Sequence, residues 1–176
     1  MDPRRRRFLA TSLRVLAGAS LVRFGASPRV ARAATLSDAA RRLLPTSPYV
    51  YVSPLLADGR ESRCHAELWF AWLDEAVVVI VAADRWKARA LASGRDRARI
   101  WVGDHGRWRG FVGTNESFRS APSFDARGAA SRDASLLDRL LATYATKYPD
   151  EIAAWRDRMR SGFADGSRVL IRYTPA

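Results

Sequence analysis

The chain has 176 residues, a formal net charge of +12 and one cysteine. A single cysteine excludes an intrachain disulfide, and two histidines leave too few neighbouring ligands for a metal centre. The length is enough for one domain with a sizeable core.

The positive charge is concentrated at the N-terminus. Residues 1–33 hold eight arginines and one aspartate, a net charge of +7. The rest of the chain holds 22 basic and 17 acidic side chains, a net charge of +5, with the arginines dispersed among the acids. Because no basic surface interleaved with aromatic residues stands out, we predict that the protein does not bind nucleic acid.

Residues 1–33 have the pattern of a twin-arginine export signal. Arg5-Arg6 is followed by one residue and then Phe8-Leu9, a weakly apolar stretch covers 10–22, and Ala31-Arg32-Ala33 is an A-x-A cleavage site. We therefore expect recognition by the twin-arginine export machinery, cleavage near Ala33, a periplasmic location and a single mature domain over residues 34–176. The alternative is a basic amphipathic anchor at a lipid surface.

The first part of the mature chain alternates between turn signals and strand patterns. A helix is expected at 35–44 and a strand at 49–56, followed by a hairpin signal at Asp58-Gly59. From Glu61 to Leu73 the even positions are apolar or small and the odd positions are polar or amphipathic. This period of two predicts one strand with a packed face and an outward face.

A buried strand and a short basic helix are predicted next. Asp74-Glu75 is a polar turn, and the Val/Ile/Ala run over 76–83 is typical of a strand buried on both faces. A helix should follow over 84–91 with Asp84 as its N-cap, and a further strand over 99–102.

The last third of the chain is predicted to be mainly helical. A strand at 107–112 precedes residues 114–132, which we expect to form an irregular loop because they are rich in Ser, Ala, Gly, Arg and Asp and have little periodicity. Beyond this loop we expect an amphipathic helix at 134–148, a second helix at 150–162 and a strand at 167–174.

About six strands and four helices are therefore expected. Hairpin signals between most consecutive strands favour an antiparallel sheet, and six short strands without a strand–helix–strand rhythm favour a small barrel. The alternative is an open antiparallel sheet with helices packed on one face.

The helix start after the buried strand is the first candidate site. It carries Arg85, Lys87 and Arg89. The first turn of a helix already has positive charge, from its unpaired backbone N–H groups and from the helix dipole. Cations there are unfavourable for the helix alone, and a bound anion would reverse that effect. The alternative is a solvated basic helix.

The outward face of the strand at 61–73 is the second candidate. It holds Arg63, His65, Glu67 and Trp69, which either face a ligand or form an exposed edge with a His65–Glu67 ion pair. No hydrolase pattern is present, because the only histidines are His65 and His105 and there is no G-x-S-x-G motif.

The order of these parts resembles the FMN-binding split-barrel family, the pyridoxamine 5′-phosphate oxidase-like proteins. The resemblance covers residues 48–113 and, less closely, 167–174. It rests on Trp69-Phe70, Asp74-Glu75, 77–81, Lys87-Ala88, Leu91 and 99–102. It implies an α+β, mainly β fold, a six-stranded antiparallel split β-barrel with flanking helices.

The resemblance also implies a function and a site. We expect an exported FMN-dependent oxidoreductase that acts on a small-molecule substrate, in which the flavin itself performs the redox step and no catalytic side chain is required. The alternative is a non-enzymatic binding protein on the same barrel that holds flavin, deazaflavin or haem. The expected cofactor-binding residues, with Lys87 at the phosphate-binding position, are Arg63, His65, Trp69, Val81, Arg85, Trp86 and Lys87.

Two further expectations follow from the resemblance. Such proteins commonly form homodimers with FMN at the interface, which Trp101, Trp108 and Phe111 could furnish; the other interpretation of these residues is ordinary core. Because the chain has no histidine after His105, it lacks the C-terminal histidine that holds pyridoxamine phosphate in the true oxidases, so we do not expect that substrate.

Overall fold

A computed structural model describes residues 35–106 and 116–176. The predicted export signal at 1–33 and the predicted strand at 107–112, with Trp108 and Phe111, lie outside the described residues. Within the described part of the chain, no helix is both long and apolar enough to cross a membrane.

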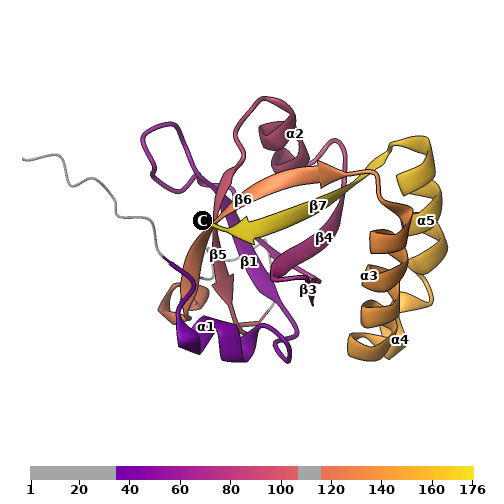
Figure 1. Cartoon of the computed structure of the whole chain (residues 1–176), viewed down its shortest axis with the longest axis horizontal. Helices are drawn as coiled ribbons and strands as arrows, with labels where there is room; N and C mark the ends of the chain where they lie inside the picture. Colours follow the sequence, from indigo (N-terminus) through magenta and orange to yellow (C-terminus); the bar gives the residue numbers. More distant parts are fainter. Residues whose placement is uncertain (1–34, 107–115) are drawn as a thin grey trace, which may run out of the picture. The chain divides into compact units, whose positions relative to one another are not determined.

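Seven strands form one antiparallel sheet in the order β2-β1-β5-β6-β7-β4-β3 (Figure 1). They are β1 (Val50–Pro54), β2 (Ala66–Leu68), β3 (Ala71–Leu73), β4 (Ala76–Ala82), β5 (Arg97–Val102), β6 (Ser123–Ser131) and β7 (Arg168–Pro175). The sheet curls into a half-barrel with flanking helices, which confirms the predicted fold class. The described strands differ from the predicted set in two ways: the stretch predicted as one strand over 61–73 forms two, and β6 lies in a stretch predicted as a loop.

The division of that strand falls at Trp69-Phe70. The hydroxyl of Tyr144 donates to the Trp69 carbonyl (2.7 Å), the Phe70 N–H donates to the hydroxyl of Tyr148 (3.3 Å), and Lys147 Nζ donates to the Phe70 carbonyl (3.2 Å). Helical side chains thus satisfy backbone groups that would otherwise need a sheet partner. The chain can therefore leave β2, which pairs with β1, and begin β3, which pairs with β4 at the other end of the sheet.

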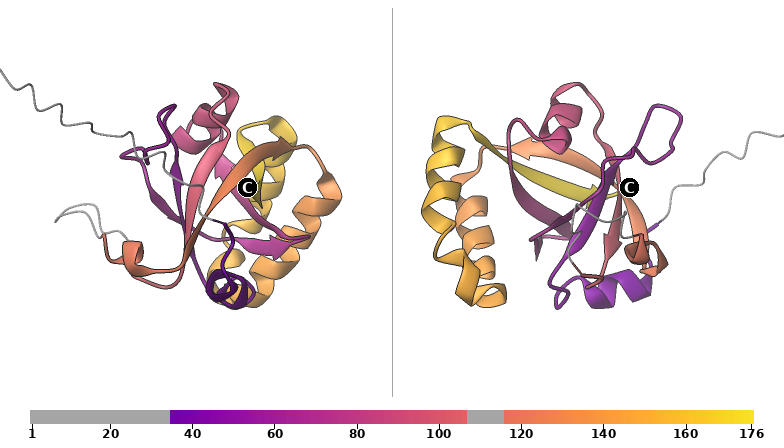
Figure 2. Two further views of the ribbon diagram at one scale, coloured as in Figure 1. Left: turned by 60° about the vertical axis from the view of Figure 1, so that its left-hand side comes forward. Right: turned by 180° about the vertical axis from the view of Figure 1, so that it is seen from behind.

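Strand β4 separates two apolar layers, as its unbroken apolar run predicts. Val77, Val79 and Val81 pack in a core shared with β1, β5, β6 and β7, whereas Val78 and Ile80 pack in a second core with the C-terminal helices. These helices, α3 (Ala134–Lys147), α4 (Pro149–Ile152) and α5 (Arg156–Asp165), lie together on one side of the sheet in all three views (Figures 1 and 2). The predicted turn at Asp74-Glu75 is confirmed, with both residues at positive φ (49° and 56°).

The loop predicted over 114–132 is wrong for most of its length. Its described part contains a short 3-10 helix, η1 (Ser117–Ser120), and β6, which pairs with β5 on one side and β7 on the other. A glycine is needed at position 128 of β6, because a Cβ there would lie 2.8 Å from Cε1 of Tyr173. The packing of β6 between β5 and β7 outweighs the low strand propensity of the β6 sequence.

The helices differ from the prediction mainly at their ends. Helix α1 (Asp38–Leu43) begins at a Ser37 cap, and α3 begins at an Asp133 cap whose carboxylate accepts from the N–H groups of Ser135 and Leu136. The helix expected over 150–162 is divided into α4 and α5. Helix α5 continues to Asp165 and ends at Gly166 with φ of 83°.

Helix α2 (Trp86–Ala92) follows β4 across a short turn. Its N-cap is Arg85 and not Asp84 as predicted, and no side chain caps it. Lys87, Ala88 and Ala90 are its buried residues, so this basic helix is not simply solvated. The buried face brings Lys87 towards the end of β4.

Candidate functional site

The curled sheet leaves an opening between its two ends. Strand β4 pairs with β7 along residues 77–82, but with β3 only along 76–78, and β2 pairs only with β1. Among the described strands, none covers the edge of residues 79–82 that faces away from β7. A cavity of about 570 Å³, here called the seam cavity, lies between this edge and β2. It is lined by Cys64, Ala66, Leu68, Ile80, Val81, Ala82, Arg85, Trp86, Lys87, Trp155 and Arg168.

Lys87 is the only fully buried charged group that lines the seam cavity in the described part of the chain. Its side chain is 5% exposed, and no described residue gives its ammonium a hydrogen bond or an ion pair. Burial lowers the pKa of Lys87 from 10.5 to about 8, a shift that the neighbouring Cys64 thiol partly opposes. A buried cation without a counter-ion is costly, so an anion in this cavity would relieve that cost.

Trp86, next to Lys87, supplies a second hydrogen-bond donor that has no partner among the described residues. Its indole Nε1 is buried and has no hydrogen-bond partner among the described residues. The guanidinium of Arg95 lies 4.9 Å from the centroid of the indole ring, a cation–π contact that helps to hold the ring in place. Two buried donors in one cavity fit a ligand that carries oxygen acceptors and charge, as the phosphate and hydroxyls of FMN do.

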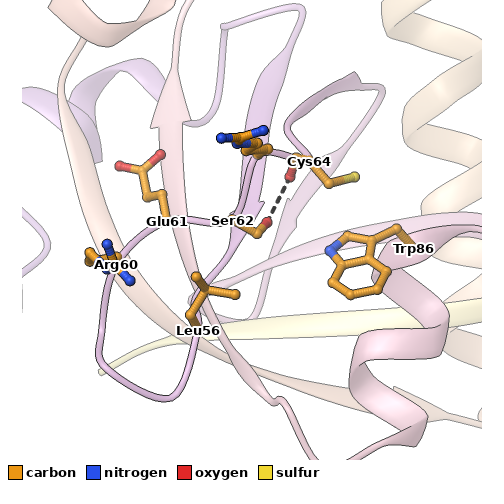
Figure 3. Close-up of a pocket in the computed structure, with 7 residues that line it drawn as sticks. Leu56, Arg60, Glu61, Ser62, Cys64 and Trp86 are labelled. Atoms are coloured by element: carbon orange, nitrogen blue, oxygen red, sulfur yellow. Dashed lines mark hydrogen bonds between the residues drawn. The ribbon is translucent and has the colours of Figure 1, made fainter.

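A second hollow of about 550 Å³, the loop cavity, adjoins the seam cavity through Cys64 and Trp86. Figure 3 shows Trp86 on one side of it and Leu56 on the other, with Arg60 and Glu61 towards the far end. The Ser62 hydroxyl donates to the Cys64 carbonyl at 3.2 Å and so helps to fix this loop.

Glu61 at the edge of the loop cavity is already neutralised. Its carboxylate lies 2.9 Å from Arg119 and 3.8 Å from Arg99, which also pairs with Asp125 at 2.8 Å. Arg63 in the same loop is exposed and has no ion pair among the described residues. The loop cavity therefore keeps a net positive lining.

A third hollow of about 400 Å³, the helical cavity, lies between β2, β4 and the C-terminal helices. It shares Leu68, Ile80, Trp155 and Arg168 with the seam cavity. Trp69 lines it but also stacks on Tyr148, with ring centroids 4.5 Å apart and an interplanar angle of 10°.

The structure brings together most of the predicted site residues. Val81, Arg85, Trp86 and Lys87 line the seam cavity, Arg63 the adjoining loop cavity and Trp69 the adjoining helical cavity. His65 is not brought to them.

His65 precedes β2 next to Cys64 but does not line the seam cavity. Its Nε2 is 3.8 Å from Glu116 Oε1, and its ring centroid is 5.0 Å from that of Phe118. The ion pair considered between His65 and Glu67 does not form, because Glu67 accepts a hydrogen bond from the Tyr51 hydroxyl at 3.0 Å. Trp101, proposed for an interface, packs edge-on against Phe118 with centroids 5.9 Å apart.

The seam-cavity residues that sequence reasoning missed include Cys64, Trp155 and Arg168. The alternation that places Cys64, Ala66 and Leu68 on one face could have indicated the first. No local pattern indicates the other two, because only the pairing of Ala82 with Arg168 brings the C-terminal strand to this opening. Within residues 35–106 and 116–176, no group of three or more His, Cys, Asp and Glu side chains is placed to hold a metal ion.

Neither a comparison with protein-family models nor one with curated proteins finds a match. Among solved structures, the haem storage protein HutZ of Vibrio cholerae is similar with a TM-score of 0.52 and 16% identity, over 81% of this chain and 91% of that one. A conserved hypothetical protein of Mycobacterium tuberculosis gives a TM-score of 0.53 and 16% identity, over 82% and 83%. At these identities the likeness shows a shared fold.

Proposed function

We propose that this protein is an FMN-binding oxidoreductase that holds its cofactor in the seam cavity, with the phosphate on Lys87. The observation that carries the proposal is that Lys87 is a buried residue whose ammonium pairs with no described residue. A phosphate dianion next to it would stabilise the charged form of Lys87 and convert an unfavourable burial into a charge-assisted hydrogen bond. The resemblance of the surrounding sequence to FMN-binding split barrels supports the same assignment.

The other lining residues have separate roles in this proposal. The indole N–H of Trp86 donates to a ligand oxygen, and the exposed guanidinium of Arg85 adds positive charge at the rim. Ala66, Leu68 and Val81 provide apolar walls that exclude water from the bound ring. Flavin supplies the hydride or electron transfer when bound, so the chain has to bind and orient it and need not supply an acid or base.

Haem binding without catalysis is the second candidate, favoured by the fold shared with the haem storage protein HutZ. Cys64 is the cavity-lining side chain best suited to ligate iron, since His65 lies outside the seam cavity. The two candidates therefore predict different ligand spectra and a different dependence on Cys64.

Titration of the purified protein separates the candidates. We expect FMN to bind and its absorption bands to shift, the K87M variant to bind FMN at least about tenfold more weakly, and a C64S variant to bind it normally. The matched control is K147M, which removes the other lysine and should leave the affinity unchanged. Binding of haem but not FMN, lost in C64S, would replace the first candidate by the second. A protein that ignores FMN, deazaflavin and haem would refute both.

Homodimer formation and a small-molecule substrate are further parts of this proposal. Their tests are the mass of the protein in solution and the reoxidation of reduced flavin by candidate substrates.

A further inference from the structure

Trp155 presents an aromatic surface where the seam and helical cavities meet. It lies at the N-cap of α5, is 38% exposed and lines both cavities. Leu43 is the other large apolar side chain with comparable exposure in the described part of the chain, and it lines neither cavity. An indole at the meeting point of two cavities offers a stacking surface to a ligand that extends from one into the other.

Arg168 adds a cation next to this indole. It is the first residue of β7, opposite Ala82 of β4, and its guanidinium lies 5.6 Å from the centroid of the Trp155 ring. It lines both cavities and forms no ion pair or hydrogen bond with the described residues. Its donors are therefore available to a ligand.

The two cavities together extend from Lys87 at one end to Trp69, Tyr144 and Met159 at the other. The Lys87 end suits a compact anion, because its cation is small, buried and unpaired. The helical cavity is lined mainly by aromatic and apolar side chains, with Glu67 also in its wall and Arg168 where it meets the seam cavity, so it suits a flat ring with polar atoms on its rim.

We propose that Trp155 and Arg168 form a ring-binding subsite for a planar aromatic heterocycle whose rim carries carbonyl oxygens, where the helical cavity meets the seam cavity that holds Lys87. This inference rests on the proposed function and adds the part of the ligand that Lys87 does not bind. Trp155 stacks on the ring, and the guanidinium of Arg168 donates to a rim oxygen in the ring plane. The site therefore recognises the heterocycle separately from its phosphate tail.

The chain offers a matched control for Arg168. The guanidinium of Arg158 also lies 5.6 Å from the centroid of the Trp155 ring, but Arg158 lines none of the three cavities. Arg158→Gln and Arg168→Gln thus each remove one cation next to the same indole. Only the second removes a group from the proposed subsite.

The test uses riboflavin, which has the heterocycle and no phosphate, beside FMN on the full-length protein. We expect Trp155→Ala and Arg168→Gln each to weaken both ligands about tenfold, because each removes one stacking or charge-assisted contact. Lys87→Met should weaken FMN and change riboflavin affinity less than about twofold, and Arg158→Gln should change neither. Trp155→Phe, which keeps a stacking ring at lower risk to the fold, should lose less affinity than Trp155→Ala.

The outcomes separate the two proposals. If Lys87→Met weakens FMN while the Trp155 and Arg168 variants bind riboflavin and FMN as the wild type does, the ring subsite is refuted and the phosphate site stands. Equal losses in Arg158→Gln and Arg168→Gln would also refute it, since the effect would then follow the indole and not the cavity. If the wild type binds neither flavin, the proposed function fails and the subsite fails with it.

Discussion

Of the two lysines of this chain, Lys87 is buried and Lys147 is half-buried, and only Lys147 has a partner among the described residues. Burial lowers the pKa of each to about 8. Lys147 donates to the Phe70 carbonyl and lies 3.7 Å from the centroid of the Phe70 ring, so its ammonium has partners within the fold that offset part of its desolvation. Lys87 has no such contact with the described residues, which is why it marks a site and Lys147 does not.

Removal of the Lys87 charge should stabilise the protein without ligand. A folded-state pKa of about 8 against 10.5 means that charged Lys87 costs up to about 3 kcal/mol near pH 7. We expect Lys87→Met to raise the free energy of unfolding, measured by urea denaturation, by an amount of this order, while it weakens FMN binding.

The difference in stability between the wild type and K87M should also depend on pH. Between pH 8 and 10.5 the unfolded chain holds a proton on Lys87 that the folded chain has lost, so wild-type stability rises with pH relative to K87M and the two curves converge. The contribution of Lys147 is the same in both proteins and cancels. A K87M variant that is less stable than wild type at pH 7 would show that the Lys87 ammonium is satisfied in the folded state.

At the scale of elements, β6 depends on the absence of a side chain at Gly128. A Cβ there would lie 2.8 Å from the ring of Tyr173, which is itself 4% exposed and cannot easily move. We expect Gly128→Ala to lower the free energy of unfolding by about 1–3 kcal/mol through overpacking. Ala129→Ser, on the exposed face of the same strand, is the control and should have little effect. Equal stability of both variants would show that the Tyr173 ring moves aside.

Local patterns predicted those elements whose apolar residues decide their own structure. The Val/Ile run of β4, the Asp74-Glu75 turn and the amphipathic α3 were all predicted correctly. β6 was missed because its sequence has little periodicity, and it is the pairing with β5 and β7 that places it in the sheet. The division between β2 and β3 was missed because the groups that satisfy it belong to Tyr144, Lys147 and Tyr148, far along the chain.

At the scale of the whole molecule, the position of some candidate-site residues could be predicted from the local sequence and that of others could not. Lys87 follows β4 directly, so its position at a cavity beside that strand could be expected from the local sequence. Trp155 and Arg168 reach the same opening only because β7 pairs with β4 and α5 precedes β7. That pairing is set by the packing of the whole sheet, and no short window of sequence contains it.

Export of the whole protein through the twin-arginine route stays a prediction. Replacement of both Arg5 and Arg6 by Lys should leave the protein in the cytoplasm, which cell fractionation and immunoblotting would measure. A cofactor bound before export would stabilise the folded state by mass action and so favour a route that carries folded proteins. Processed protein in normal amounts outside the cytoplasm in this variant would contradict the assignment.

The central claim, that Lys87 is the anion anchor of the seam cavity, is tested most directly by lysine NMR. With only two lysines in the chain, 13C-labelled Lys side chains should give two Cε signals, which the K147M variant assigns. We predict that Lys87 titrates with a pKa of about 8 in the free protein and that saturating FMN raises this pKa, because the phosphate stabilises the charged form, while Lys147 does not change. A Lys87 pKa that FMN leaves unchanged would contradict the account.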